Sequence, residues 1–156
     1  MDVPDFERAE STLDKAYECA TNYRRNFDTF QIDTQKARFL LQASLSGHLK
    51  DSDPYEVFFE ASTLLKKAVY SKKGKLNQVI TQVMLFIPYY NEFGKHFSNQ
   101  QKNLLLRTLE DYFDLIEKWN AGQQGKARPR TISKRNIDNL SQLRQTILMS
   151  ATQENT

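Results

Sequence analysis

The sequence predicts an all-α fold, a single-domain bundle of five to six helices, and three observations support this. A chain of 156 residues is long enough to bury a hydrophobic core without disulfides or metals. Its 5 Gly and 4 Pro supply few turn residues for a protein built of many short strands. Apolar residues recur at steps of three and four along much of the chain, as they do on one face of a helix. We expect one domain over 1–156, with a core bundle over about 30–122, an N-terminal helix within 1–29 and a basic connector plus C-terminal helix within 123–156.

Three helices are expected in the first half of the chain. The clearest periodicity predicts a first helix that packs on the body or docks on a neighbouring subunit. Asp33 or Thr34 is suited to cap a second helix that ends near Gly47. Asp53 is suited to cap a third helix, with Pro54 at its first position. The stripe of the first helix is Phe6, Ala9, Leu13, Ala16, Ala20, Tyr23 and Phe27.

The next stretch, 76–87, is rich in β-branched residues, so a strand is the competing interpretation. Helical spacing sustained over three turns favours a helix that Pro88 bends or ends. Ser98 and Gln101 have the spacing of a capping box and predict a further helix that is central to the core. Its inner stripe is Leu105, Leu109, Tyr112, Ile116 and Trp119.

The segment 120–130 contains Gly122, Gly125 and Pro129, and it therefore predicts a flexible connector rather than a packed element. A last helix is expected to start at Ser133 and to fray after Ser150.

The composition excludes several classes of protein. Cys19 is the single cysteine, so no internal disulfide forms; its small apolar neighbours indicate a core position, and a reducing compartment fits. No run approaches the roughly 20 apolar residues that a bilayer needs, and the first residues lack the pattern of a signal peptide. The mean hydropathy of −0.67 describes a polar surface. We expect a soluble, cytoplasmic protein with no membrane partner.

No motif for catalysis is found. His48 and His96 are the only histidines and neither has a catalytic pattern around it, and phosphate-loop, dinucleotide, zinc and calcium signatures are absent. We therefore expect no enzyme, no catalytic residues, no cofactor and no metal site. A metal-dependent enzyme built on the acids of one helix is the weakest alternative, because those acids lack a histidine partner and read as a solvated face. They are Glu110, Asp111, Asp114 and Glu117.

The two halves of the chain differ in net charge. Residues 1–61 hold 12 acids and 7 bases, a net −5, whereas residues 62–156 hold 7 acids and 15 bases, a net +8. The second half is therefore expected to attract polyanions, because flexible arms of Lys and Arg bind phosphate backbones without reading sequence. The alternative is that these charges only keep the surface solvated. One cluster surrounds Gly74 and consists of Lys66, Lys67, Lys72, Lys73 and Lys75; the other consists of Lys126, Arg128, Arg130, Lys134 and Arg135.

The middle of the chain, about 30–122, resembles the small all-helical subunit of type III CRISPR effector complexes. The stretch Ile32 to Leu41 has a Thr-led start followed by Arg38 and a Leu pair. Tyr70 followed by Gly74 and Lys75 is similar to that family's Tyr and Gly-Arg turn, with a spacing one residue longer. The first helix and the basic C-terminal region are additional to a compact family member, so a related small subunit from another CRISPR effector type fits as well. The late helix carries the family's Arg and Glu two residues apart, here Arg107, Glu110 and Tyr112.

This resemblance implies a non-catalytic structural subunit of an antiviral ribonucleoprotein complex, present in several copies. Its partners would be the guide and target RNA strands, held through their phosphates, and other effector-complex subunits. On family grounds Arg38, Lys75 and Arg107 are strand-contacting candidates, and Lys73 of the first basic cluster is a further candidate. On charge grounds the candidates are Lys126, Arg128, Arg130, Lys134 and Arg135. Arg107 pairing with Glu110 or Asp111 is the structural alternative, and a protein-only helical adaptor or oligomeric scaffold is the alternative function.

Overall fold

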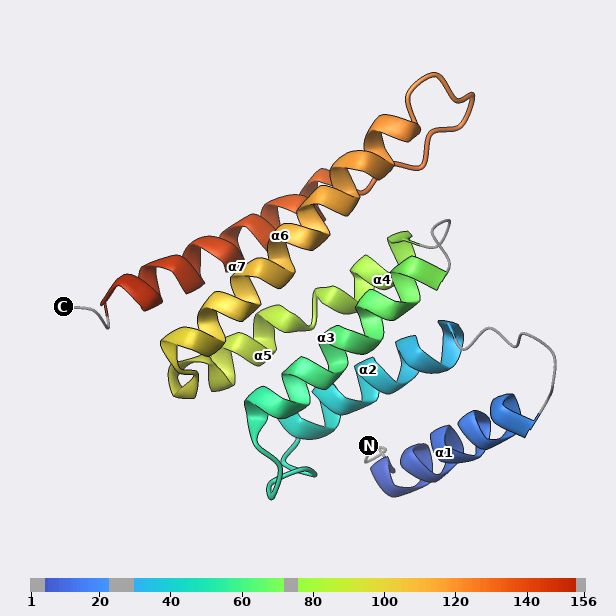
Figure 1. Ribbon diagram of the computed structural model, residues 1–156, viewed down its shortest axis with the longest axis vertical. Helices are drawn as coiled ribbons and strands as arrows, with labels where there is room; N and C mark the ends of the chain where they lie inside the picture. Colours follow the sequence, from blue (N-terminus) through green and yellow to red (C-terminus); the bar gives the residue numbers. More distant parts are fainter. Residues whose placement is uncertain (1–4, 23–29, 72–75, 154–156) are drawn as a thin grey trace. The chain divides into compact units, whose positions relative to one another are not determined.

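The structure is a computed structural model that describes residues 5–22, 30–71 and 76–153, and Figure 1 shows its helices. Within these residues all regular structure is helical, so the predicted all-α fold class is confirmed. The elements are α1 (Phe6–Asn22), α2 (Phe30–Leu45), α3 (Pro54–Ser71), α4 (Leu76–Val83), α5 (Phe86–Phe93), a short 3₁₀ turn (Gly94–His96), α6 (Asn99–Gly122) and α7 (Lys134–Gln153).

The chain forms two compact units, which we call the N-terminal unit (residues 1–92) and the C-terminal unit (residues 93–156). The single domain with a core over about 30–122 stays a prediction.

The N-terminal unit is built around α2, which lies between α1 and α3 (Figure 1). Small buried residues, Ala37 on α2 and Ala61 and Ala68 on α3, let these two helices approach closely. Tyr89 of α5 is buried against them, at 0% exposure. Its hydroxyl donates to the Pro54 carbonyl oxygen at 2.7 Å and lies 3.0 Å from the Ser44 hydroxyl, so it joins the end of α2 to the start of α3.

The C-terminal unit is a helical hairpin of α6 and α7, which run side by side (Figure 1). Lys102 Nζ donates to Ser150 Oγ at 2.8 Å, which fixes the register of the two helices near the start of α6 and the end of α7. The connecting loop and the first turn of α7 therefore form the other end of the hairpin. The buried apolar residues of α6 and α7 are Leu105, Leu109, Tyr112, Ile116, Leu140, Leu143 and Ile147.

Two predicted caps are confirmed, and so is the predicted start of the last helix at Ser133. The Ser98 hydroxyl accepts from the Gln101 amide while the Gln101 side chain accepts from the Ser98 amide, which is the predicted capping box. The Asp53 carboxylate accepts from the Glu56 amide at 3.1 Å at the start of α3. The Ser133 hydroxyl accepts from the Asn136 amide at 3.2 Å at the start of α7.

The predicted cap of α2 is wrong. The helix begins at Phe30, so Asp33 and Thr34 lie inside its first turn rather than before it. Thr34 Oγ1 donates back to the Phe30 carbonyl oxygen at 2.8 Å, and Asp33 is buried. Burial of Phe30 extends the helix by a turn beyond the point where the polar residues suggested a start.

The helix predicted over 76–87 is broken into α4 and α5 by a turn at Met84 and Leu85. Pro88 accounts for the break, because it has no amide hydrogen to donate to the Met84 carbonyl four residues earlier. That carbonyl instead accepts from the Ile87 amide at 3.2 Å. Pro88 itself is tolerated, since it lies in the first turn of α5.

Helix α1 is less buried than its periodicity suggested. None of residues 5–20 is fully buried, and Cys19, predicted to be a core residue, is exposed. Cys19 is offset around the helix from the stripe that contains Ala16 and Ala20, which explains its exposure. Tyr23 and Phe27, the end of the predicted stripe, lie outside the described residues.

Candidate nucleic-acid interface

The five cations of the second cluster lie together at the loop end of the α6–α7 hairpin. We call the segment 123–135 that carries them the basic loop. All five side chains are exposed, and no acidic residue occurs between Glu117 and Asp138. The five are Lys126, Arg128 and Arg130 in the connection, and Lys134 and Arg135 in the first turn of α7.

The basic loop is hydrogen-bonded to the end of α6, so the prediction of a connector that is not a packed element is wrong, whereas its flexibility stays a prediction. Trp119 Nε1 donates to the Arg130 carbonyl oxygen at 2.7 Å, and the Arg130 amide donates to Gln123 Oε1 at 3.0 Å. The Ile132 amide donates to Asn120 Oδ1 at 2.8 Å. Gln123 and Ile132 are 4% and 3% exposed, so both are packed. The returning backbone at Arg130 and Ile132 is therefore tied to the last turn of α6, from which the loop presents its cations.

The local sequence explains this path. The helix α6 ends at Gly122, and Gly125 has a φ of +83°, a left-handed conformation that glycine adopts without strain. The chain reverses there and returns along the last turn of α6. Ser133 then caps α7. The glycines that suggested flexibility thus shape a defined turn.

The electrostatics of the basic loop favour an anionic ligand. Lys134 and Arg135 lie in the first turn of α7, where the helix dipole is positive and where acidic residues are normally favoured. Together with Lys126 and Arg128, they make no hydrogen bond or ion pair with any side chain within the described residues. Their charge is therefore not neutralised by the protein at this place.

Arg107 is exposed on α6 but stands apart from the basic loop. It lies 12 residues before Trp119, which corresponds to about 18 Å along the helix axis. It pairs with neither Glu110 nor Asp111, which was the structural alternative; Glu110 instead accepts from the Arg144 guanidinium at 3.0 Å. The Arg144 guanidinium also lies over the Phe113 ring, 4.5 Å from its centroid. Across the described part of the chain, Arg107 has neither a hydrogen bond nor an ion pair from its side chain.

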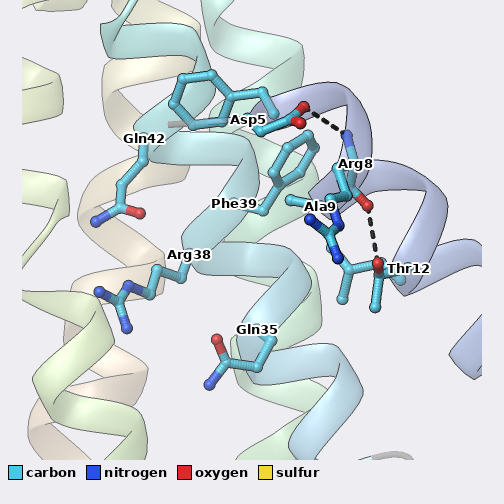
Figure 2. A pocket seen from close by; sticks show the side chains of 10 residues that line it. Asp5, Arg8, Ala9, Thr12, Gln35, Arg38, Phe39 and Gln42 are labelled. Atoms are coloured by element: carbon cyan, nitrogen blue, oxygen red, sulfur yellow. Dashed lines mark hydrogen bonds between the residues drawn. The ribbon is translucent and has the colours of Figure 1, made fainter. Parts of the chain in front are cut away.

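Arg38 belongs to the N-terminal unit, whereas Arg107 and the basic loop belong to the C-terminal unit. It is exposed and borders a groove of 570 Å³ between α1 and α2. Figure 2 shows Arg38, Gln35 and Gln42 on the α2 side of this groove, with Arg8 on the α1 side. The apolar residues that line it are Phe6, Ala9, Leu13 and Phe39.

The first basic cluster is only partly described. Lys73 and Lys75 lie outside the described residues, so their predicted role stays a prediction. Lys67 Nζ lies 3.5 Å from a carboxylate oxygen of Asp33, which gives this lysine a structural partner.

The aromatic residues divide into core residues and one candidate that the sequence did not suggest. Tyr55, Tyr89 and Tyr90 are buried and unavailable to a ligand. Trp119, expected in the core, is only partly buried and is tied to the basic loop. Trp119 directly precedes the glycines and cations of the loop, and this position in the sequence indicated a role beside the loop. Helical spacing alone assigned it to the core instead.

The described residues offer no gathering of three or more His, Cys, Asp or Glu side chains suited to a metal ion. None of the described helices combines the length and apolarity needed to cross a membrane. Of the acids on α6, Glu110 is engaged by Arg144. What the described residues do place together is a set of exposed cations in the basic loop, which suits electrostatic binding of an anion.

Comparison of the chain with family models, with curated proteins and with solved structures gives no match.

Proposed function

We propose that this chain is a non-catalytic RNA-binding protein that holds the phosphate backbone with its basic loop. The observation that carries this proposal is the anchored loop with five exposed cations, four of which have no side-chain partner among the described residues. A solvated surface needs neither a fixed loop nor the exclusion of acids from it.

Counterion release sets the expected strength. Each phosphate contact to a single strand contributes a slope of about −0.7 to the dependence of log affinity on log salt, so four such contacts contribute about −3. Binding of this kind is weak at physiological salt and tolerant of sequence. It suits a protein that accompanies an RNA strand whose sequence is recognised elsewhere.

The resemblance to the small subunit of type III CRISPR effector complexes gives this proposal a finer form. In that form several copies of the chain line the guide and target RNA and contact other effector subunits. An all-helical fold and an exposed Arg107 without a described partner support it. Arg38, exposed on α2, would be a further strand contact.

The test is the binding of a fluorescently labelled oligouridine, measured by anisotropy over a range of salt concentrations. A variant with the four unpaired loop cations changed to Gln, at Lys126, Arg128, Lys134 and Arg135, is expected to lower the salt slope by about 3 and low-salt affinity by about tenfold or more. The matched control changes four exposed cations outside the loop, Arg8, Lys15, Lys50 and Lys95, and is expected to keep most of the slope. Equal losses in both variants would show a general charge effect and would refute the loop as the site.

A protein-protein adaptor is the second candidate, and exposed apolar residues near the other end of the hairpin favour it. Leu104 on α6 and Leu148 and Met149 on α7 are exposed. Salt-sensitive self-association of the purified chain, without any binding of RNA in the same assay, would select the adaptor.

A further inference from the structure

We infer that the ligand of the basic loop is single-stranded and that one of its unpaired bases stacks on Trp119. This inference rests on the proposed function and names the form of nucleic acid that the same site takes. Trp119 is the only tryptophan in the chain, and it is partly exposed where α6 meets the loop.

The ring of Trp119 is held in place by the loop that carries the cations. Its Nε1 donates to the Arg130 carbonyl oxygen at 2.7 Å. This hydrogen bond joins the indole to the loop backbone between Arg128 and Ile132. A stacking ring with a fixed orientation loses little conformational freedom when a base is added. The hydrogen bond therefore prepares the indole for a flat ligand.

The faces of the indole are not used by another ring or cation. Among the described residues, Trp119 makes no aromatic contact and no cation–π contact, in contrast to Phe58 and Phe86, whose ring centroids lie 4.6 Å apart in the core. A partly exposed aromatic ring beside a run of cations in the chain is the combination that single-strand-binding proteins use.

The charges around the ring permit a phosphate backbone to approach. The nearest acid in sequence, Glu117, lies two residues earlier on α6, which is about 200° around the helix from Trp119. On the loop side, the chain carries only cations up to Asp138. The indole and the loop cations therefore belong to one stretch of the chain, residues 118–137, that contains no acid.

This geometry selects single strands over duplexes. In a duplex each base is stacked on its neighbours and paired, so it cannot cover an indole without being extruded. In a single strand every base has a free π-face, which makes such stacking tolerant of sequence. The basic loop alone would bind both forms, and Trp119 adds the preference.

Tryptophan emission tests this directly when it is excited at a wavelength that tyrosine does not absorb, because Trp119 is the only tryptophan. The full chain is titrated at low salt with oligouridine and, separately, with a blunt RNA duplex of the same length, while anisotropy of the labelled RNA reports binding. We expect strong quenching with the single strand and little with the duplex, although both bind. Single-strand binding without quenching, or equal quenching by both, would overturn the stacking but leave the proposed function intact. Failure of both RNAs to bind would overturn both.

Two variants separate stacking from a purely structural role. Trp119→Phe keeps a flat ring and loses the N–H donor, whereas Trp119→Leu loses both. Stacking predicts that the Leu variant loses about tenfold in single-strand affinity while the Phe variant stays within about threefold of wild type. It also predicts an unchanged salt slope in both, since no charge is removed. Equal losses in Phe and Leu would show that Trp119 acts only by holding Arg130, and circular dichroism checks that both variants remain helical.

Discussion

Charged groups are arranged in opposite ways in two regions of this molecule. Where α1, α2 and α3 meet, they are paired with one another: Tyr17 donates to Asp33 at 2.6 Å, Lys67 lies 3.5 Å from the same carboxylate, and Lys36 lies 3.4 Å from Glu60. In the basic loop, four of five cations have no side-chain partner within the described residues.

Burial explains the difference. Asp33 is 1% exposed, and a buried carboxylate is strongly unfavourable unless hydrogen bonds and opposite charges compensate it. Burial also raises the pKa of Tyr17 well above its usual value, and the hydrogen bond to Asp33 and the charges of Asp33 and Glu60 act in the same direction. The loop cations are exposed, so water compensates them and they need no protein partner. Pairing indicates charges that hold the fold, and exposure without pairing indicates charges that are available to a ligand.

The largest expected effect is on stability, from Asp33→Ala. It removes the acceptor of the Tyr17 hydroxyl, and we expect a loss of about 2–3 kcal/mol in unfolding free energy. Most of this should come from the hydrogen bond, because Lys67 is 60% exposed and its ion pair is screened by water. Urea denaturation measures the loss.

Two controls sharpen that experiment. The double variant with Tyr17→Phe should lose little more than Asp33→Ala alone, since the two residues share one interaction. RNA affinity should stay unchanged, because the basic loop belongs to the other unit. A loss below about 0.5 kcal/mol, the level of an ordinary surface substitution, would contradict the role given to Asp33.

The same contrast shows how far sequence reasoning reaches in the fold. Periodicity predicted the helices, and the caps at Asp53, Ser98 and Ser133 were recognisable because capping is a local interaction over three residues. Asp33 was misassigned because its partner, Tyr17, comes from another helix 16 residues away. No local pattern distinguishes a carboxylate that caps a helix from one that turns inward.

In the candidate site, the cations could be predicted from the sequence, but the hydrogen bonds that hold the loop backbone could not. Lys126 and Arg128 are evident from composition alone. The anchoring depends on hydrogen bonds between Trp119 and Arg130 and between Asn120 and Ile132, which span 11 and 12 residues. The glycines of this segment indicated mobility, and only the structure shows that Gly125 shapes a fixed turn.

A smaller effect on stability is expected at Tyr89, the neutral counterpart of Asp33 in the same unit. Tyr89→Phe loses the hydrogen bonds to Pro54 and Ser44, and we expect a loss of about 1–2 kcal/mol in unfolding free energy.

The pH dependence provides a separate signature of Tyr89. Burial raises the pKa of Tyr89 to about 12 from a usual value of 10.0, with the charge of Asp53 adding to the rise and the Ser44 hydrogen bond opposing it. The unfolded phenol loses its proton at lower pH than the folded one, so stability is full below pH 10 and falls as pH rises towards 12. Denaturation midpoints across this range should fall less in Tyr89→Phe than in wild type. Parallel curves would show that Tyr89 does not titrate as described.

The smallest expected effect has the opposite sign and bears most directly on the comparison. Lys134→Gln with Arg135→Gln removes two cations from the positive end of the α7 dipole, and we expect a gain of up to about 1 kcal/mol in unfolding free energy at low salt. The same variant should bind oligouridine more weakly, with a salt slope lower by about 1.4. The matched pair, Lys126→Gln with Arg128→Gln, removes the same charge from the connection after α6, away from the positive end of a helix, and should weaken binding equally without the gain in stability. The gain should vanish at high salt, because exposed charges are screened there. If the two double variants changed the unfolding free energy alike, the dipole argument would fail. If only Lys134→Gln with Arg135→Gln stabilises the fold, and both variants weaken binding, then Lys134 and Arg135 lower the stability of the fold. This is expected of charges that are kept for a ligand.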